Sequence, residues 1–303
     1  MHDVSDFPSD PFTWRPVRDR GVTQAQLRHA LALGAVVKLL RGVYARSGVE
    51  LTPLVRAQAA ALVISPHSVV VDRTASWVWG VECYRYAELD GTPPVETCVL
   101  RGHQATERSE VAGVTRDLLP EDWVDLDGLR VTTPLRTAMD LGCRLWPPYA
   151  LGVMDALMRE HHFSRSDLER LMRRYRGRRG VVRLRGLVPL ADARAESQPE
   201  SAVRYIIVSS GLAEPVIQVW VTVEGADYRL DLAYPRAKVA VEYDGEEFHT
   251  SPEQVRHDKA RRAAMRRAGW IVIVVTKADL AMTSDQQWLV RLGEALRERG
   301  VRP

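Results

Sequence analysis

The last hundred residues alternate helical and strand-like segments in an order that few folds share. A helix capped by Ser197 or Ser201 comes first, and three strand-like segments, a helix, a fourth strand and a last helix follow it. The strand-like segments span 216–223, 228–234, 239–243 and 270–275, and the helices between and after them span 251–268 and 284–299. The run 270–275 is apolar throughout, which is typical of a strand buried on both faces. This order predicts an α/β domain that starts near residue 196.

Two acids lie within the apolar strands of that domain. Asp231 stands between Leu230 and Leu232, and Glu242 directly follows the apolar segment 239–241. A buried carboxylate costs free energy unless a partner compensates it, and two carboxylates on neighbouring strands repel each other. A divalent cation such as Mg²⁺ or Mn²⁺ removes both costs and activates water for attack on a phosphate. The alternative is a structural ion pair of one acid with Arg229 or Arg236.

The spacing of further residues around these acids is specific. The pattern reads Asp231, ten residues, Glu242-Tyr243-Asp244-Gly245-x-x-x-His249, followed by His257-Asp258-x-x-Arg261 and Gly269-Trp270. It resembles the PD-(D/E)xK phosphodiesterase superfamily, and within it the very-short-patch-repair-like branch. The resemblance covers 196 to about 280 and implies a metal-dependent nuclease core with a central mixed sheet.

The resemblance assigns roles to individual residues. Asp231 and Glu242 correspond to the metal-binding acids, and His249 corresponds to a histidine that serves as general acid or phosphate ligand. Many members of the superfamily supply one more glutamate from the preceding helix, for which Glu196 and Glu200 are the candidates. We favour Glu200 as the third metal ligand, and Gln218 is either a polar residue lining the site or an ordinary strand residue.

Asp244 departs from the superfamily pattern. The lysine that usually stands two residues after the strand acid orients the attacking water, and an aspartate lacks that positive charge. In the branch that this sequence resembles, aspartate is the usual occupant, so Asp244 counts among the catalytic candidates. His249 or Lys259 is then expected to supply the missing charge or proton. Alternatively, Asp244-Gly245 is only a turn signal.

The N-terminal region has a different pattern. Thr23 followed by Gln26 is a capping box, and 27–31 continues with helical spacing. Two short strand-like pieces, 36–40 and 42–45, follow around a turn at Arg41-Gly42. A helix followed by a small hairpin predicts a winged helix-turn-helix.

Three motifs of the first half resemble the AbiEi-like type IV antitoxin family. They are 21–27, 41–45 and Thr133-Pro134-x-Arg136-Thr137-x-x-Asp140. The resemblance covers 19 to about 145 and implies that the first part binds DNA. As partners it implies a cognate toxin or another protein of a defence operon. The last motif is equally read as a capped helix with an Arg136–Asp140 pair one turn apart.

Charge is distributed unevenly along a nearly neutral chain. The chain carries 42 Lys and Arg against 39 Asp and Glu, for a net charge of +3, yet arginines cluster within 159–185 and 256–267. Such clusters suit a local phosphate-binding face or an ordinary solvated helix face. We expect contacts to the DNA backbone from basic side chains of the N-terminal helix and hairpin and of the helix 251–268. These residues are Arg28, Lys38, Arg41, Lys259, Arg262 and Arg266.

These observations predict a multidomain α+β protein. The expected parts are a polar tail (1–18), a winged-helix DNA-binding domain (19–62), an AbiEi-like α/β middle domain (63–147), a basic helical connector (148–195) and a restriction-endonuclease-like domain (196–303). No apolar run approaches the length of a membrane helix, so we expect a cytoplasmic protein. The expected activity is that of a Mg²⁺-dependent endodeoxyribonuclease in phage defence, a toxin–antitoxin system or DNA repair. The alternative is a non-catalytic DNA-binding regulator or antitoxin with a nuclease-like binding domain.

The winged-helix prediction can be tested without any substrate for cleavage. A fragment comprising 1–150 should bind duplex DNA in the absence of metal, and binding should weaken as salt rises because neutralised phosphates release counterions. Electrophoretic mobility shifts over a salt series measure this. A fragment that shifts no duplex at any salt concentration would contradict the prediction.

Overall fold

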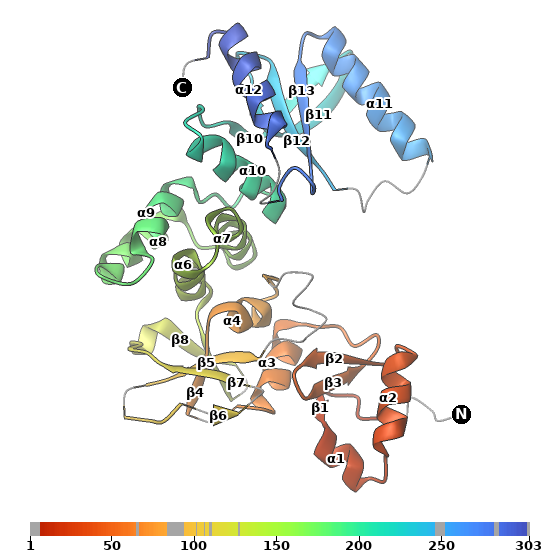
Figure 1. Cartoon of the computed structure of the whole chain (residues 1–303), viewed down its shortest axis with the longest axis vertical. Helices are drawn as coiled ribbons and strands as arrows, with labels where there is room; N and C mark the ends of the chain where they lie inside the picture. Colours follow the sequence, from red (N-terminus) through yellow and green to blue (C-terminus); the bar gives the residue numbers. More distant parts are fainter. Residues whose placement is uncertain are drawn as a thin grey trace. The chain divides into compact units, whose positions relative to one another are not determined.

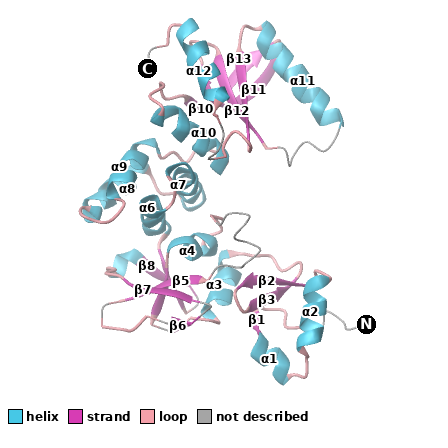
Figure 2. Cartoon of the chain, viewed as in Figure 1, coloured by secondary structure: helices cyan, strands magenta, loops and turns pink. Residues whose placement is uncertain are grey.

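The computed structural model describes residues 7–64, 67–83, 94–100, 102–105, 107–108, 111–126, 128–245, 252–281 and 285–301 (Figure 1). The protein is α+β, with strands and helices in both halves of the chain (Figure 2). The chain divides into two compact units, Met1–Leu141 and Gly142–Pro303. The domain boundaries expected near 148 and 196 both fall within the second unit.

The first unit begins with a three-stranded sheet and two helices. The elements are β1 (Phe12–Thr13), α1 (Trp14–Asp19), α2 (Gln24–Ala32), β2 (Val36–Leu40) and β3 (Val43–Arg46), and the strand order is β1-β3-β2. The helix α2 starts where the sequence predicted, because the Thr23 side chain accepts the Gln26 N–H and the Gln26 side chain accepts the Thr23 N–H. The antiparallel hairpin of β2 and β3 is also confirmed.

The interpretation of 1–18 as a polar tail was wrong for residues 7–18. Phe7, Phe12 and Val17 are buried together with Leu27 of α2 and Val36 of β2, and β1 pairs with β3. Three apolar side chains spread among polar residues are enough to bury the segment, although the average composition is polar. Composition hid this because only the apolar residues face the core.

A six-stranded mixed sheet forms the rest of the first unit. Its strand order is β6-β7-β5-β4-β9-β8, and β4 pairs parallel to β9 while β5 pairs parallel to β7. The strands are β4 (Ser68–Val70), β5 (Val95–Val99), β6 (Glu107–Arg108), β7 (Val111–Thr115), β8 (Trp123–Leu126) and β9 (Leu129–Thr132). The helices α3 (Pro53–Ala61) and α4 (Asp72–Val78) contribute Ala59, Ala60, Ala75 and Val78 to the core beneath this sheet. The helix α6 (Pro134–Arg144) then leads into the second unit.

The second unit opens with a layer of helices. They are α7 (Pro147–His161), α8 (Arg165–Met172), α9 (Val181–Leu187) and α10 (Gln198–Ser209), with short 3-10 turns at Arg173–Tyr175 and Val188–Leu190. Ser197 caps α10 by accepting the Glu200 N–H, so the first of the two predicted caps is the one used. The helix α7 is buried along most of its length, from Pro148 to Met158.

A four-stranded sheet carries the predicted acids. It runs β10 (Val216–Val223), β11 (Ala226–Tyr234), β12 (Val239–Asp244) and β13 (Ile271–Thr276), in this spatial order. The first three strands are antiparallel, and β13 is parallel to β12 because α11 (Pro252–Arg267) crosses between them. One face is covered by α10 and α12 (Gln287–Glu298), and the other by α11. Trp270 belongs to the core on the α11 side, as predicted.

A glycine lets α7 and α10 approach closely. A Cβ atom placed at Gly152 of α7 would lie 2.8–3.0 Å from the Cβ, carbonyl oxygen and Cα of Gln198, the first residue of α10. Two of these atoms belong to the backbone, which cannot swing aside as a flexible side chain does. The start of α10, and with it Glu200, therefore owes its place to the absence of a side chain at Gly152.

We expect Gly152→Val to push the two helices apart and to lower the free energy of unfolding by about 1–3 kcal/mol. The matched control is Gly186→Ala on α9, where an added Cβ meets no atom within 4 Å. That control should be neutral or slightly stabilising, because alanine favours a helix more than glycine does. Denaturant unfolding of the full chain measures both. Equal stability of the two variants would show that the close approach at Gly152 does not hold α10.

Candidate functional site

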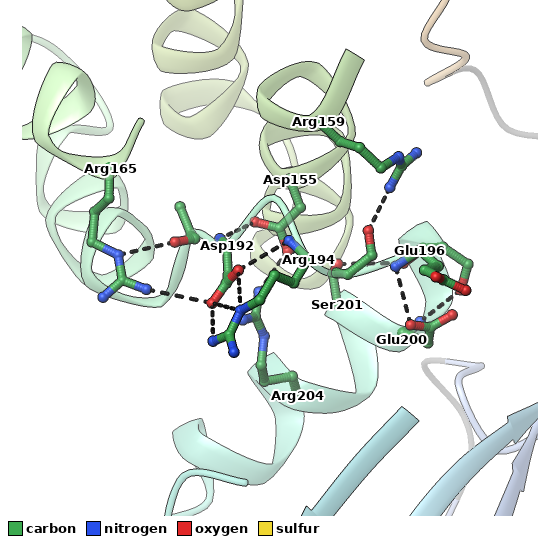
Figure 3. Close-up of polar contacts among 12 residues, drawn as sticks. Asp155, Arg159, Arg165, Asp192, Arg194, Glu196, Glu200, Ser201 and Arg204 are labelled. Atoms are coloured by element: carbon green, nitrogen blue, oxygen red, sulfur yellow. Dashed lines mark hydrogen bonds and ion pairs between the residues drawn. The ribbon is translucent and has the colours of Figure 1, made fainter. Parts of the chain in front are cut away.

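Glu200 lies at the start of α10 and is buried. Its Oε2 accepts two hydrogen bonds, from the Gln218 side-chain amide at 2.8 Å and from the Glu196 backbone N–H at 3.2 Å. Glu196 precedes α10, so the four-residue spacing of the two glutamates does not place them on one helix face. Glu196 turns to Arg229 and forms an exposed ion pair (Figure 3 labels both glutamates). The geometry thus favours Glu200 over Glu196 as the site residue.

Asp231 and Glu242 lie on adjacent antiparallel strands. The register pairs Leu232 of β11 with Val241 of β12. Asp231 precedes Leu232 and Glu242 follows Val241, so in these antiparallel strands both acids lie on the same side of that pair. The Tyr243 backbone N–H donates to Asp231 Oδ2 at 3.0 Å. The pKa of Asp231 is raised to about 7, first by burial and then by the charges of Glu200 and Glu242, while the Tyr243 N–H and Arg261 act to lower it. The raised pKa indicates that the three carboxylates interact across one small region.

Gln218, for which the sequence left open a place in the site or an ordinary strand position, contacts Glu200 in this region. It lies within β10 with a φ of 52°, in the left-handed region that non-glycine residues rarely adopt. Ile217 pairs with Leu232 and Val219 with Leu230, so the register between β10 and β11 omits Gln218 and Asp231. Its Nε2 binds Glu200, while its Oε1 is buried without a hydrogen-bond partner in the part of the chain that the structure describes. Backbone strain and an unsatisfied buried acceptor at one residue are typical of a site rather than of an ordinary strand. Its position between apolar residues was the only signal in the sequence.

Two arginines of α11 compensate part of the negative charge. Arg261 Nη2 donates to Glu242 Oε1 at 2.6 Å and to the Arg229 carbonyl oxygen at 2.9 Å. Arg262 Nη2 donates to Asp244 Oδ2 at 2.7 Å, so this arginine, expected to reach DNA, binds a candidate catalytic residue instead. Glu242 is therefore paired, but with Arg261 rather than with the Arg229 or Arg236 that the sequence offered.

The donor set is chemically suited to a hard cation. Carboxylates of Glu200, Asp231 and Glu242 and the free amide oxygen of Gln218 are the oxygen ligands that Mg²⁺ prefers. Among the described residues, however, no three acid, histidine or cysteine side chains already stand at metal-binding distances. The residues fit a divalent ion by type, and Glu242 is bound to Arg261 in this structure.

A buried ion pair holds α10 from the side opposite the sheet (Figure 3). Asp155 of α7 accepts hydrogen bonds from the Ser201 hydroxyl at 2.7 Å, from Arg204 and from the backbone N–H of Asp192 at 2.7 Å. Only about 1% of the Asp155 and Arg204 side chains is exposed. Burial raises the pKa of Asp155 to about 7, although Arg204 and the two other donors act to lower it. The residues next to Glu200 are thus fixed by a cluster that sequence reasoning missed.

The remaining predicted residues lie apart from this cluster or outside the description. Arg28 of α2 and Lys38 of β2 are exposed in the first unit, and Arg41 is half-buried at the hairpin turn. Arg266 of α11 is exposed in the second unit. His249 lies outside the described residues, and so does the side chain of Lys259.

The motif at Thr133–Asp140 forms the centre of a buried charge network in the first unit. Arg136 donates to Asp140 at 2.9 Å, one turn along α6, and to Asp122 at 2.7 Å. Arg116 then joins Asp140 to Asp72, the first residue of α4. The intrahelical pair of Arg136 and Asp140 is confirmed, whereas sequence reasoning missed Asp72, Asp122 and Arg116, which come from separate segments.

Comparison with known proteins finds a similarity to one family for part of the chain. Residues 59–190 match the family of the AbiEi antitoxin C-terminal domain. The match runs from α3 to the 3-10 turn at Val188–Leu190, before α10, so it includes the charge network around Arg136 and the arginine-rich helices. It supports the AbiEi-like interpretation of the middle of the chain.

Two proteins of Mycobacterium tuberculosis are similar over nearly the whole length. One is an uncharacterized protein of strain CDC 1551 and the other an uncharacterized protein of strain H37Rv. Each is 29% identical over 260 residues, which is 86% of this chain and 92% of the relative.

In the part of the chain that is described, no helix has the length and apolar character needed to cross a membrane.

The raised pKa of Asp231 makes a prediction about pH. In the folded protein the Asp231 carboxyl keeps its proton up to about pH 7, whereas the ordinary pKa of an aspartate is 3.8. The folded state therefore binds more protons between these two values, and the free energy of unfolding falls as pH rises from about 4 to about 7. Asp231→Asn removes the titration and keeps an acceptor for Tyr243. Relative to the wild type, the variant should therefore gain about 2–4 kcal/mol in free energy of unfolding between pH 4 and pH 8.

Denaturant unfolding at a series of pH values in EDTA measures this gain. The control is Asp227→Asn on the same strand, where the aspartate is exposed and bound to Thr222. Its stability relative to the wild type should stay nearly constant over the same range. A difference that stays flat for Asp231→Asn as well would show that the pKa of Asp231 is not raised in the folded protein.

Proposed function

We propose that this protein hydrolyses DNA phosphodiester bonds with the help of a divalent metal ion held by Glu200, Asp231 and Glu242. The observation that carries the proposal is the electrostatic interaction of Asp231 with Glu200 and Glu242, together with the hydrogen bond of Glu200 to Gln218, whose buried amide oxygen has no partner in the described part of the chain. Three carboxylates within reach of one another repel, and a protein tolerates such a cluster when a cation or a proton relieves it. In the metal-free protein, burial and the charges of Glu200 and Glu242 together raise the pKa of Asp231.

A bound Mg²⁺ or Mn²⁺ would supply an activated water and would stabilise the charge that develops on the scissile phosphate. The chain's own residues would provide the rest. Gln218 keeps Glu200 oriented through its amide, and the Tyr243 N–H fixes one oxygen of Asp231. Arg261 brings a positive charge to Glu242, and Arg262 brings one to Asp244, the position where the superfamily's lysine is missing. We propose that Arg261 turns from Glu242 to a substrate phosphate when metal is bound.

The first unit supports the choice of DNA as substrate. The helix α2 and the hairpin of β2 and β3 present Arg28 and Lys38 to solvent, an arrangement suited to a winged-helix contact with the phosphate backbone. The similarity of 59–190 to an antitoxin domain suggests a toxin–antitoxin or phage-defence setting, with a cognate toxin as a partner. We propose that this half selects or anchors the DNA on which the carboxylate site acts.

A second function is favoured by a different observation. Arg261 and Arg262 already pair with Glu242 and Asp244, so part of the site is neutralised without any metal ion. This arrangement, together with the antitoxin similarity, fits a DNA-binding regulator whose nuclease-like domain only binds nucleic acid or a partner protein. In that case the acids serve stability, and cleavage is absent under all conditions.

Cleavage assays with matched variants decide between the two functions. Wild-type protein, Asp231→Ala and Asp227→Ala are incubated with plasmid, single-stranded DNA and mismatched duplex in Mg²⁺, Mn²⁺ or EDTA. We expect cleavage by the wild type and by Asp227→Ala in either metal, none in EDTA, and a loss of about 100-fold or more for Asp231→Ala. All three proteins should bind DNA with similar affinity in EDTA, since Asp231 does not bind phosphate.

The absence of metal-dependent cleavage by the wild type on all three substrates would support the regulator. So would a wild-type melting temperature that Mg²⁺ leaves unchanged, because binding of an ion to the folded state alone must raise the midpoint. Equal cleavage by Asp231→Ala and the wild type would show that the activity comes from another site of the chain or from a contaminating nuclease.

A further inference from the structure

Positive charge is concentrated in one segment of the second unit that the proposed site does not use. Residues 163–190 contain nine arginines, no lysine and two acids, Asp167 and Glu169, for a net charge of +7. Because the whole chain carries +3, the remaining residues together carry −4. So large a local excess repels itself unless an anionic partner offsets it.

The segment is an ordered part of the fold. The helix α8 begins with a capping box in which Ser164 and Asp167 exchange hydrogen bonds. Gly177 and Gly180, both with positive φ, shape the turn before α9, and a Cβ atom at Gly180 would collide with the backbone of Cys143. The turn thus lies directly against the end of α6, so its arginines project from a fixed backbone.

Some of the arginines already have roles within the protein. Arg170 pairs with Asp167, Arg183 donates to the carbonyl oxygens of Arg144 and Leu145, and Arg178 lies 4.7 Å from the ring centre of Tyr175. Four others are exposed and have no acidic partner within the described parts of the chain. We call these four the arginine surface: Arg173, Arg176, Arg179 and Arg185.

The chemistry of the arginine surface indicates its ligand. A guanidinium group presents paired N–H donors that match the oxygens of a phosphate, and arginine is the residue of choice where phosphates are recognised. Four exposed guanidinium groups without an acidic partner in the described parts of the chain therefore favour a phosphate-bearing ligand.

We propose that the arginine surface binds the phosphate backbone of duplex DNA. It is distinct from the basic residues of α2, the β2–β3 hairpin and α11, and it lies in the same compact unit as the carboxylate site. Its role would be to hold the duplex on this unit while the carboxylate site acts. The choice of DNA over other phosphate polymers rests on the proposed function, whereas the binding itself does not depend on cleavage.

The test measures binding in EDTA, where no cleavage occurs. The variant carries Arg173→Gln, Arg176→Gln, Arg179→Gln and Arg185→Gln in the full chain. The matched control changes four exposed arginines elsewhere in the second unit, and so alters the net charge equally: Arg236→Gln, Arg291→Gln, Arg297→Gln and Arg299→Gln. Fluorescence anisotropy with a duplex of random sequence gives the Kd at several salt concentrations.

We expect the arginine-surface variant to bind at least about tenfold more weakly at low salt. The slope of log K against log salt should become shallower by about 0.9 for each phosphate that the variant no longer neutralises. The control should stay within about twofold of the wild type at each salt concentration. Thermal melts verify that both proteins fold. If the fourfold variant does not fold, the double variants Arg173→Gln/Arg176→Gln and Arg179→Gln/Arg185→Gln replace it, each with a smaller loss of affinity expected.

Equal affinity and equal salt slope for variant and wild type would overturn the proposal, as would a control that loses as much affinity as the variant. A loss confined to structured RNA, with duplex DNA binding unchanged, would overturn the choice of DNA. Failure of the proposed function gives a different result, since a wild type that never cleaves can still show the arginine-dependent binding in EDTA.

Discussion

The buried carboxylate of Asp155 joins α7 to α10, the helix that packs against the sheet of the second unit. It lies on α7 and receives hydrogen bonds from Ser201 and Arg204 of α10 and from the chain that leads into α10. Removing one partner of such a buried pair leaves a charge without compensation and typically costs about 3–5 kcal/mol. Because Ser201 directly follows Glu200, the pair also fixes the glutamate that faces the sheet. The segment similar to an antitoxin domain, which includes α7, thus helps to position the candidate site.

The candidate site has the opposite electrostatic character. Where Asp155 has three donors, Asp231 has one backbone donor and two neighbouring carboxylates, and its pKa rises to about 7. Gln218 adds backbone strain and an unsatisfied oxygen at the same place. A fold that tolerates strain and repulsion at one point, while satisfying charges elsewhere, is typical of a site that awaits a ligand. The arginine pairs of Glu242 and Asp244 then act as a metal-free resting arrangement in our proposal.

The comparison of sequence and structure separates local signals from distant ones. The capping box at Thr23, the cap at Ser197 and the four strands of the second unit were predictable, because each depends on a few neighbouring residues. The polar tail was wrong, because Phe12 and Val17 become core residues only once the hairpin of β2 and β3 is in place. The pairing of Glu242 with Arg261 was missed for the same reason, since nineteen positions separate the two residues in the sequence.

The sequence by itself determined the order of the helices and strands of the second unit, the position of Asp231 and Glu242 within apolar strands, and the excess of arginine in 163–190. Periodicity, capping residues and composition are local properties, so they can be read without the fold. Only the tertiary structure decided between Glu196 and Glu200, gave Gln218 its strained backbone and its free oxygen, and joined Asp155 to Arg204. These features depend on strand register and helix packing, which bring together residues that are far apart along the chain.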